Sequence, residues 1–484
     1  MVVLATLWQY CWLLVKNSLR FNKEYLMKRK QQVLIAGLAA LGLLAGACSS
    51  DSESSVTEAP VVTDAPGVTE APTVTDAPNA DGDLVQWALD YTEGTAGMAS
   101  GDSIKIGYVN QEDYFPENTI GINAAVEFIN NELGGAAGRP LEIVPCNIAV
   151  AEDGAKCGTE FANNADIAAV VTGTILVGNK ELYDALNTKK PVIIGNGVTS
   201  DDFTTAAGSA FTAGSPGVVA GMAGFVVSQL GDVKNVAIIA GNNAAGIAGA
   251  DLLFKPVIEK AGIAYTFVGV DDTATAADVA SAMTAVGADT ADVVVLIVTL
   301  QQCINVYDAS KALGIDPVIV ATGLCFGTPM TDHLAEAGDG GTVPNNWYFG
   351  GYGYSYFQPD YESGMQTYLD KVQKYGVPAP GAANLEYTGF AGPSFANIMT
   401  LTKFFNQLGP DALDYAGIDG KIRGFKGPMM IVAGPLDCGK QVILGLPIFI
   451  SVCGSQMGIQ QYKDGEWLSI ADALNGKPID ATKV

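Results

Sequence analysis

Five loops rich in Gly, Thr, Ser and Asn carry the side chains best suited to hold a ligand. Each loop follows an apolar run of the kind that forms a β-strand, and the loops span residues 171–179, 195–202, 240–246, 298–302 and 321–327. Short hydroxyl and amide groups, with free backbone N–H groups at helix starts, suit a small polar ligand. Ordinary turn chemistry produces the same composition, so each position also has a purely structural explanation. The residues expected to contact the ligand are Thr172, Gly173, Thr174, Asn196, Val198, Thr199, Ser200, Asn243, Gln301 and Leu324.

Catalytic and cofactor signatures are weak, and we expect no catalytic residue, metal site or cofactor. The chain has one histidine, His333, on which to build a triad or a metal site. Residues 434–441 resemble a phosphate-binding P-loop, but Pro435 lacks an N–H and Gln441 stands where Ser or Thr would hold magnesium. Residues 241–249 follow a strand and open a helix, yet they lack the spacing of a dinucleotide-binding loop.

The loops must be positioned by strands that alternate with helices. Continuous apolar strands bounded by Gly are typical of parallel sheets covered on both faces. Residues 118–135 place apolar side chains on one helical face, and Gly134 is suited to end that helix. The pattern predicts an α/β fold with two doubly wound lobes. Strands are expected at 103–109, 141–146, 167–173 and 191–197 in the first lobe, and at 235–241, 265–270, 292–299 and 317–323 in the second.

The two lobes are expected to exchange chain segments. We predict that the first lobe comprises residues 103–215 and 352–440, and that the second comprises 216–351 and 441–484. The helical segment 359–407 would return to cover the first lobe, and the tail from Gly427 would be strand-like. Glycine suits a hinge because it tolerates backbone change. The three crossings are therefore expected near 214–217, 349–353 and 440–446.

The N-terminal region has the order of an export signal. Three basic residues, 28–30, precede an apolar run of 15 residues, 33–47, which is too short to span a bilayer and ends in small residues before Cys48. We predict a signal peptide at 27–47, with Cys48 as a lipid-attachment site similar to that of bacterial lipoproteins. Residues 1–26 are then a misassigned extension, or alternatively an unusual anchor. A buried helix with an incidental cysteine is the structural alternative.

An acidic spacer is predicted after Cys48. The segment 56–78 repeats Val-Thr-(Glu or Asp)-Ala-Pro four times at a period of six and has no large apolar residue, so it cannot bury enough surface to order itself. We expect residues 48–83 to be a disordered, extended stalk that holds a folded body away from a membrane. The net charge of −25 argues against nucleic acid and anionic membrane surfaces as partners. Together with the export signal, this charge leads us to expect an extracytoplasmic location, with the protein anchored to the cell membrane by lipid.

Six further cysteines lie in the folded part of the chain. An even number in an exported protein indicates disulfides, although six cysteines allow 15 pairings and buried free thiols remain the alternative. Local pairing within single supersecondary units is the interpretation adopted: Cys146 with Cys157, Cys303 with Cys325, and Cys438 with Cys453.

Several segments resemble the periplasmic binding proteins of ABC importers, of the branched-chain-amino-acid type. The resemblance covers roughly 103–484 and includes "IKIGYV", "GINAAVEFINNELGGAAGRPLEIV", "VVTGTI", "PVIIGNGVTSDDFT", "NVAIIAG" and "FKGPM". It implies the type I fold, with two Rossmann-like lobes joined by three hinge crossings. It also implies a monomeric, membrane-tethered receptor that closes on a small solute and delivers it to a permease with its ATPase.

The chain departs from this family where amino-acid ligands are held. The family uses an acidic residue of the second lobe for the ligand's ammonium, and that place falls on Leu324 or Cys325 here. A buried, unpaired charge is costly, so we expect a polar solute without a lone ammonium, such as an amide or a hydroxylated acid. A shift of a few residues would instead bring Glu112, Asp201 or Asp202 into the site. A ligand-sensing receptor with a membrane signalling partner and an exported α/β enzyme are the alternative functions.

Overall fold

The computed structural model describes residues 80–339, 343–353, 356, 362–377, 388–432, 434, 436–440, 443, 445–469 and 479–480. The predicted extension, signal peptide and Cys48 lie outside the described residues, as does most of the predicted spacer. Helix α2 (Ala80–Thr92) begins inside the range predicted for the spacer and packs on the first lobe, where Ala88 is buried. No helix within these residues is both long and apolar enough to cross a bilayer.

Sheet 1 is a five-stranded parallel sheet in the order β2-β1-β3-β4-β5. In β1, Ile106 and Tyr108 pack in one hydrophobic core while Val109 packs in another, which is the alternation of a strand buried on both faces. The strands are β1 (Ile104–Asn110), β2 (Leu141–Asn147), β3 (Ile167–Thr172), β4 (Val192–Ile194) and β5 (Ser209–Ala210).

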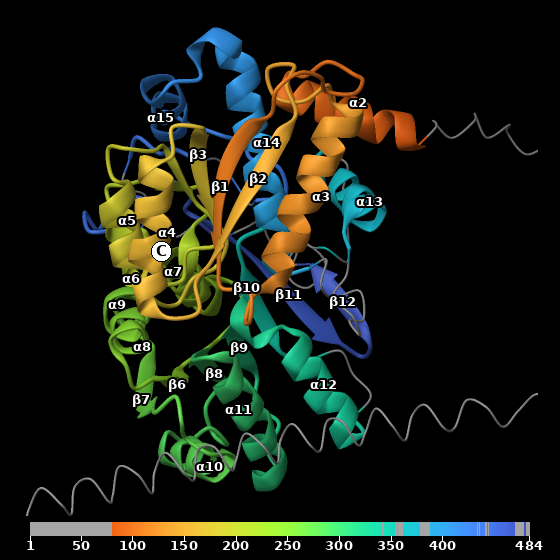
Figure 1. Ribbon diagram of the computed structural model, residues 1–484. Coiled ribbons are helices and arrows are strands. Elements are labelled where there is room, and N and C mark those ends of the chain that lie inside the picture. The colour runs from red at the N-terminus through yellow and green to blue at the C-terminus, as the bar shows by residue number, and fades with distance from the viewer. Residues whose placement is uncertain are drawn as a thin grey trace, which may run out of the picture. The chain divides into compact units, whose positions relative to one another are not determined.

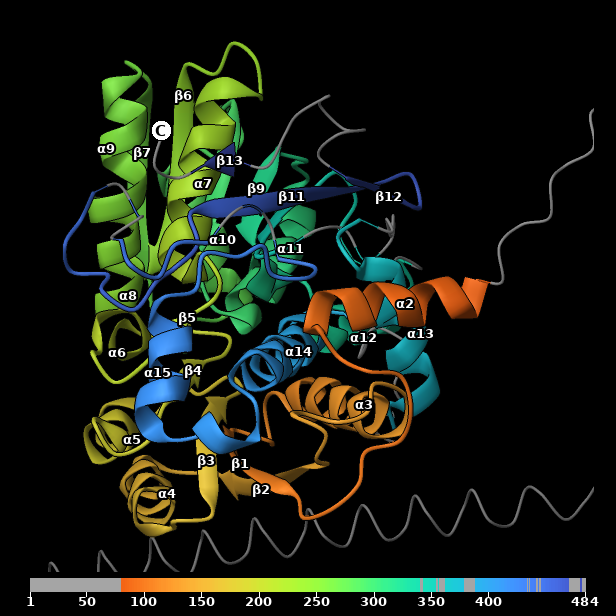
Figure 2. The ribbon, with the colours of Figure 1, turned by 90° about the horizontal axis from the view of Figure 1, so that it is seen from above.

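Helices cover both faces of sheet 1. Figure 2 shows α3 and α14 on one side of the sheet and α4 and α5 on the other. Helices α3 and α14 touch closely, because a Cβ built on Gly121 would lie 2.0 Å from the carbonyl oxygen of Ala391. The bounds are α3 (Pro116–Glu132), α4 (Ala151–Asn163), α5 (Asn179–Leu186), α6 (Ser200–Thr204), α13 (Met365–Tyr375), α14 (Ala391–Leu408) and α15 (Tyr415–Arg423). Helices α13 and α14 return to the first lobe, as the sequence predicts.

Sheet 2 has eight strands, with β12-β11-β10-β9-β8-β6-β7 in line and β13 paired to β11. Strands β6 to β10 are parallel, and β11 joins β10 in the antiparallel sense. The strands are β6 (Asn235–Gly241), β7 (Ala264–Val270), β8 (Val293–Ile297), β9 (Ile319–Thr322), β10 (Tyr348–Gly351), β11 (Gln456–Lys463), β12 (Glu466–Ser469) and β13 (Ile479–Asp480).

One face of sheet 2 is covered by α7, the π-helical turn η2 and α9, and the other by α10, α11 and α12 (Figure 1). The bounds are α7 (Gly214–Ser228), α8 (Ala244–Ala248), η2 (Gly249–Phe254), α9 (Lys255–Lys260), α10 (Ala276–Ala285), α11 (Leu300–Leu313), the 3₁₀ turn η3 (Gly323–Cys325) and α12 (Thr328–Ala337). Two sheets, each with helices on both faces, confirm the predicted doubly wound α/β architecture with two lobes.

The segments that cross between the lobes are joined by isolated β-bridges. Ala210 pairs with Val452, Gly353 with Val432, and Leu436 with Gly454. Two details differ from the sequence analysis. Residues 214–217 already form the first turn of α7, so the first crossing precedes them. The tail becomes a regular strand only at β11, and the residues described between 427 and 455 form isolated bridges instead of a ladder.

Candidate ligand-binding site

The predicted loops lie at the carboxyl ends of the parallel strands. Strand β5 ends at Ala210, directly before the first crossing, and β10 ends at Gly351, directly before the second. Because the strands of each parallel set run in one direction, the loops after β1, β3 and β4 share the crossing side of sheet 1. The loops after β6, β8 and β9 share the crossing side of sheet 2 in the same way. Ligands of open α/β sheets bind at this edge.

A buried network of polar side chains joins the loops of the first lobe. The Asn118 Nδ2 donates to Thr174 Oγ1 at 3.1 Å and to Asn110 Oδ1 at 3.3 Å. The Asn196 Nδ2 donates to Asn118 Oδ1 at 2.7 Å and to Ser394 Oγ at 3.1 Å, so the network reaches α14. All five side chains are buried. Thr174 and Asn196 therefore use much of their hydrogen-bonding capacity inside the lobe, where they hold the ends of β1, β3 and β4 together.

Thr172 and Gly173 connect the loop after β3 to the loop after β4. The Thr172 hydroxyl accepts a hydrogen bond from Gly195 N at 3.0 Å, and the Gly173 carbonyl accepts one from Asn196 N at 3.1 Å. A Cβ at Gly173 would lie 2.4 Å from Asn110 Oδ1, so only glycine allows this approach. The predicted residues of these two loops are thus brought together, chiefly by their own backbone.

Asp202 organises the remaining predicted residues of the first lobe. Its buried carboxylate accepts hydrogen bonds from Val198 N at 2.9 Å and Thr199 N at 2.8 Å, and from Asn179 Nδ2 at 2.8 Å and Tyr183 OH at 2.6 Å. Burial raises the pKa of Asp202, although these hydrogen bonds act in the opposite direction. The carboxylate faces the protein and shapes the 198–199 turn, whereas Ser200 is exposed.

The predicted residues of the second lobe lie nearer the surface. Asn243 caps α8 through a hydrogen bond from Gly246 N at 2.9 Å, and its Nδ2 contacts the Asp272 carboxylate at 3.2 Å. Gln301 is exposed and bonds Asn305 at 3.3 Å, and Leu324 is half-buried in η3. Asp272 was missed by sequence reasoning, although an Asp-Asp pair directly after the predicted strand 265–270 was the available signal.

Aromatic side chains also gather beside the second crossing, and the sequence pattern does not predict them as site residues. Phe115, in the loop after β1, makes an edge contact with Phe390 at 5.7 Å between ring centroids, and Phe390 stacks on Tyr352 at 6.2 Å. The Tyr352 hydroxyl donates to the Gly197 carbonyl at 3.1 Å, and loss of water raises the pKa of Tyr352 to about 12. Tyr114 is 67% exposed beside this cluster in sequence. The run "YFP" after a predicted strand was the only signal for this group.

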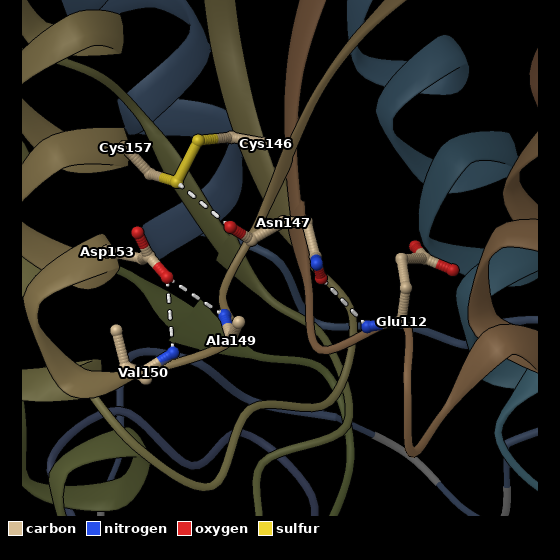
Figure 3. The surroundings of a disulfide bond; sticks show 7 residues. All are labelled: Glu112, Cys146, Asn147, Ala149, Val150, Asp153 and Cys157. Carbon is tan, nitrogen blue, oxygen red and sulfur yellow. Dashed lines mark hydrogen bonds between the residues drawn. A yellow bond between two sulfur atoms is a disulfide. The ribbon is translucent and has the colours of Figure 1, made fainter. Parts of the chain in front are cut away.

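Glu112 is a further carboxylate on this edge of the first lobe. One oxygen, Oε1, accepts hydrogen bonds from Asn110 Nδ2 at 2.9 Å and from the Thr119 hydroxyl. The backbone N–H of Glu112 donates to Asn147 Oδ1 at 3.0 Å, and Figure 3 shows the side chain directed away from Asn147 and the neighbouring disulfide. Of the three acids that an alignment shift would admit, Glu112 is half-buried at the loop after β1, whereas Asp202 is turned into the protein.

Three disulfides reinforce the crossing side of the molecule. They join the same cysteines that the sequence indicates: Cys146 to Cys157, Cys303 to Cys325, and Cys438 to Cys453. The first ties the end of β2 to α4 (Figure 3), the second ties α11 to η3, and the third joins two irregular segments of the crossing region beside the isolated bridge of Leu436 and Gly454. Cys325 lies at one of the two positions that correspond to the acidic residue of the family noted above, and its sulfur is held in a disulfide.

The remaining chemical candidates lie elsewhere. His333 is on α12, where its Nε2 is 2.6 Å from the Asp308 carboxylate. Among the residues that the structure describes, no three His, Cys, Asp or Glu side chains gather as metal ligands would. The site is therefore an edge of loops whose backbone and short polar groups suit the binding of a solute.

Comparison with known proteins identifies the family. A family model described as "Periplasmic binding protein" matches residues 107–426. Among solved structures, a leucine binding protein of Thermotoga maritima superposes with a TM-score of 0.60 at 13% identity, and the match covers 79% of this chain and 100% of that one. No curated protein matches the sequence.

Two further solved structures show which ligands such folds accompany. A fatty acid ABC transporter substrate-binding protein of Thermomonospora curvata superposes with a TM-score of 0.60 at 13% identity, covering 78% of this chain and 94% of that one. An ABC transporter solute binding protein of R. palustris, in complex with 4-hydroxybenzoate, has a TM-score of 0.60 at 15% identity, covering 79% and 99%. At these identities the likeness establishes the fold.

Proposed function

The chain belongs to the periplasmic binding protein family, and from that premise we propose that it is the extracytoplasmic solute-binding lipoprotein of an ABC importer. The observation that carries the proposal is the family match over 107–426, combined with loops from both lobes at the strand ends beside the crossings. Acylated Cys48 and the 48–83 spacer would tether the folded body to the membrane. The bound solute would then pass to a permease driven by its ATPase.

We propose that the first lobe, predicted as 103–215 and 352–440, moves as one body against the second, predicted as 216–351 and 441–484, with the first boundary placed before Gly214, where α7 begins. Hinge motions concentrate in a few connecting residues that absorb backbone change. The isolated bridges between the crossing strands give those residues few mutual hydrogen bonds. Closure would bring the loops at Gly173–Thr174 and Val198–Ser200 toward those at Asn243, Gln301 and Leu324. Backbone N–H groups and short polar side chains would bind the solute between them.

The proposed ligand is a small polar solute of the amino-acid, amide or related class. The second lobe offers no acid at Leu324 or at Cys325, which favours a ligand without a lone ammonium. Glu112 is the residue that could reverse this preference. It is a half-buried carboxylate on the first lobe, where it could receive a ligand's ammonium. A ligand that reaches Glu112 could present a hydrogen-bond donor to it, whereas on the second lobe the carboxylate of Asp272 is already engaged by the Asn243 amide.

Native mass spectrometry of the protein purified without refolding would test the proposal. A mass excess that disappears on mild denaturation would identify the solute, and X-ray scattering with the recovered solute should show compaction. Identical scattering profiles with and without saturating solute would contradict the closing mechanism. Uptake that persists when the chain is deleted, together with loss of a transcriptional or behavioural response, would instead assign it to a sensing receptor.

A further inference from the structure

A cavity lies at the amino edge of sheet 1, at the opposite end of the strands from the crossing-side loops. Its volume is about 300 Å³, and it is bordered by the starts of β1 and β3, the turn before β4 and the start of α15. Figure 1 shows α15 close to β3 at this part of the lobe. The side chains that carry the argument are Arg139, Asp166, Lys189, Lys190 and Asp414.

Lys190 is a buried cation in this cavity, with 8% of its surface exposed. Its Nζ donates to the backbone carbonyls of Asn164 and Ile167, each at 2.7 Å, and an ammonium has a third hydrogen to offer. Burial lowers the pKa of Lys190, which reflects the cost of holding the charge away from water. An anion beside Nζ would reduce that cost.

Arg139 and Lys189 add two more positive charges. The Arg139 guanidinium donates to the backbone carbonyls of Asp102 at 2.8 Å and Ser103 at 3.2 Å, and Lys189 is exposed at the rim. Within the described part of the chain, none of the three cations forms an ion pair. Three cations outside ion pairs line one cavity of a chain whose net charge is −25, and the nearby Asp166 carboxylate offsets part of the charge of Lys190.

The two acids that line the same cavity are already engaged. Asp166 pairs with Lys105 at 3.3 Å, and Asp414 accepts a hydrogen bond from Gly417 N at 2.8 Å as the N-cap of α15. The first turn of α15, beginning at Tyr415, also borders the cavity. The positive end of a helix favours a negative group. The cavity thus combines three cations that form no ion pair with a helix N-terminus that the Asp414 carboxylate already caps.

We propose that this cavity binds a small oxyanion, such as phosphate, sulfate or a carboxylate, held by Lys189, Lys190 and Arg139 beside the first turn of α15. The site is distinct from the solute-binding edge and does not depend on the proposed transport function. Charge-assisted hydrogen bonds from ammonium and guanidinium groups supply the affinity. The bound anion would fix the turn before β4 against the start of α15.

Inorganic phosphate is the probe, added to the folded protein at constant ionic strength with chloride as the balancing salt. We expect saturable binding by calorimetry and shifts of the backbone amide signals of Tyr415 and Ala416. Lys189→Gln should weaken phosphate about tenfold, as expected for the loss of one charged hydrogen bond. Lys260→Gln, which removes an exposed lysine at the end of α9, should leave the affinity unchanged.

Lys189 is the residue chosen for substitution because it is exposed, so the variant should fold like the parent. A Lys190 variant would remove a buried hydrogen-bonding group and is not needed. Absence of saturable binding would overturn the proposal. Equal weakening by Lys189→Gln and Lys260→Gln would overturn it as well, because it would indicate general charge screening.

Discussion

The Ser451 hydroxyl donates a hydrogen bond to the backbone carbonyl of Asp202 at 2.5 Å. The contact joins residues 249 positions apart: Ser451 lies in a turn of the crossing region, and Asp202 shapes the turn after β4. The amide of Ser451 donates to Phe203 O at 3.3 Å, and its carbonyl accepts from Ala210 N at 2.8 Å. The turn at residues 198–202 is therefore hydrogen-bonded directly to the region where the lobes connect. A backbone movement in the crossing region should displace this turn.

Ser451→Ala tests this connection. The substitution leaves the Asp202 carbonyl without the Ser451 hydroxyl as donor, and we expect a loss of roughly 1 kcal/mol of unfolding free energy. It should also weaken solute binding, measured by calorimetry, because the 198–202 turn loses its attachment. Ser228→Ala is the matched control, since its hydroxyl donates to Gly224 O at 2.6 Å inside helix α7. If Ser451→Ala and Ser228→Ala bind the solute with equal affinity, solute binding does not depend on the hydrogen bond between Ser451 and the turn.

Gly173→Ala tests the close approach of the loop after β3 to Asn110. The new Cβ would lie 2.4 Å from Asn110 Oδ1 in a fully buried network. We expect destabilisation of about 1–3 kcal/mol in urea unfolding, together with weaker solute binding. Gly420→Ala on α15 is the control, because no neighbouring atom lies within 4 Å of its Cβ position and alanine favours helix. An unchanged stability of Gly173→Ala would contradict the rigid packing of this loop.

The ionisation of Glu132 should make the unfolding free energy depend on pH in the acid range. Burial acts to raise the pKa of Glu132, but hydrogen bonds from Lys374 and Tyr375 and the charge of Lys371 outweigh it, so the pKa lies below its usual value. A carboxyl whose pKa falls on folding stabilises the protein above its unfolded pKa and loses that effect as pH drops through the folded pKa. Stability should therefore decline as pH falls below about 4.5.

Glu132→Gln should lower the unfolding free energy at neutral pH by roughly 1–3 kcal/mol and flatten its decline in acid. Urea unfolding between neutral and acid pH measures both effects. Glu127→Gln, at an exposed position of the same helix, should change neither. If the unfolding free energies of Glu132→Gln and the parent protein fall in parallel as pH drops, Glu132 is not the cause of the pH dependence.

Cys48→Ala tests the lipid anchor. If Cys48 is acylated after removal of residues 27–47, the variant should be released from membranes or remain unprocessed. Fractionation and intact mass measure the two outcomes. Cys11→Ala lies before the predicted signal and should leave anchoring unchanged. Membrane retention of Cys48→Ala with a lipid-modified mature mass would exclude Cys48 as the attachment site.

A thermal-shift panel tests the ligand class. A ligand at about 100 times its Kd stabilises a protein by roughly 2.7 kcal/mol, so binders should stand out. Amides, urea-like compounds and hydroxylated acids are expected to stabilise the protein more than leucine, isoleucine or valine. Stabilisation by these amino acids that disappears in Glu112→Gln would show that Glu112 receives the ammonium. Such a result would contradict the preference inferred from Leu324 and Cys325.

The local pattern of the chain determined the fold class and the order of its parts. Apolar runs that end at glycine predict β3, β4 and β6, because a strand buried on both faces is apolar along its length. The positions of the loops at strand ends follow from the same alternation, whereas the local disulfide pairs were one choice among 15 pairings and the structure decided them. These features depend on residues near one another in sequence, where periodicity and turn chemistry act.

Tertiary structure alone decided which side chains face the site. Thr174 and Asn196 look equally available in the sequence, yet Asn118 of α3 occupies the Thr174 hydroxyl, and Asn118 and Ser394 of α14 occupy the Asn196 amide nitrogen. The cluster of Phe115, Tyr352 and Phe390 joins three segments that no periodicity links. The cavity around Lys190 likewise requires β3, the turn before β4 and α15 to meet. Such contacts arise from the packing of segments far apart in the chain, which a linear pattern of residue types does not encode.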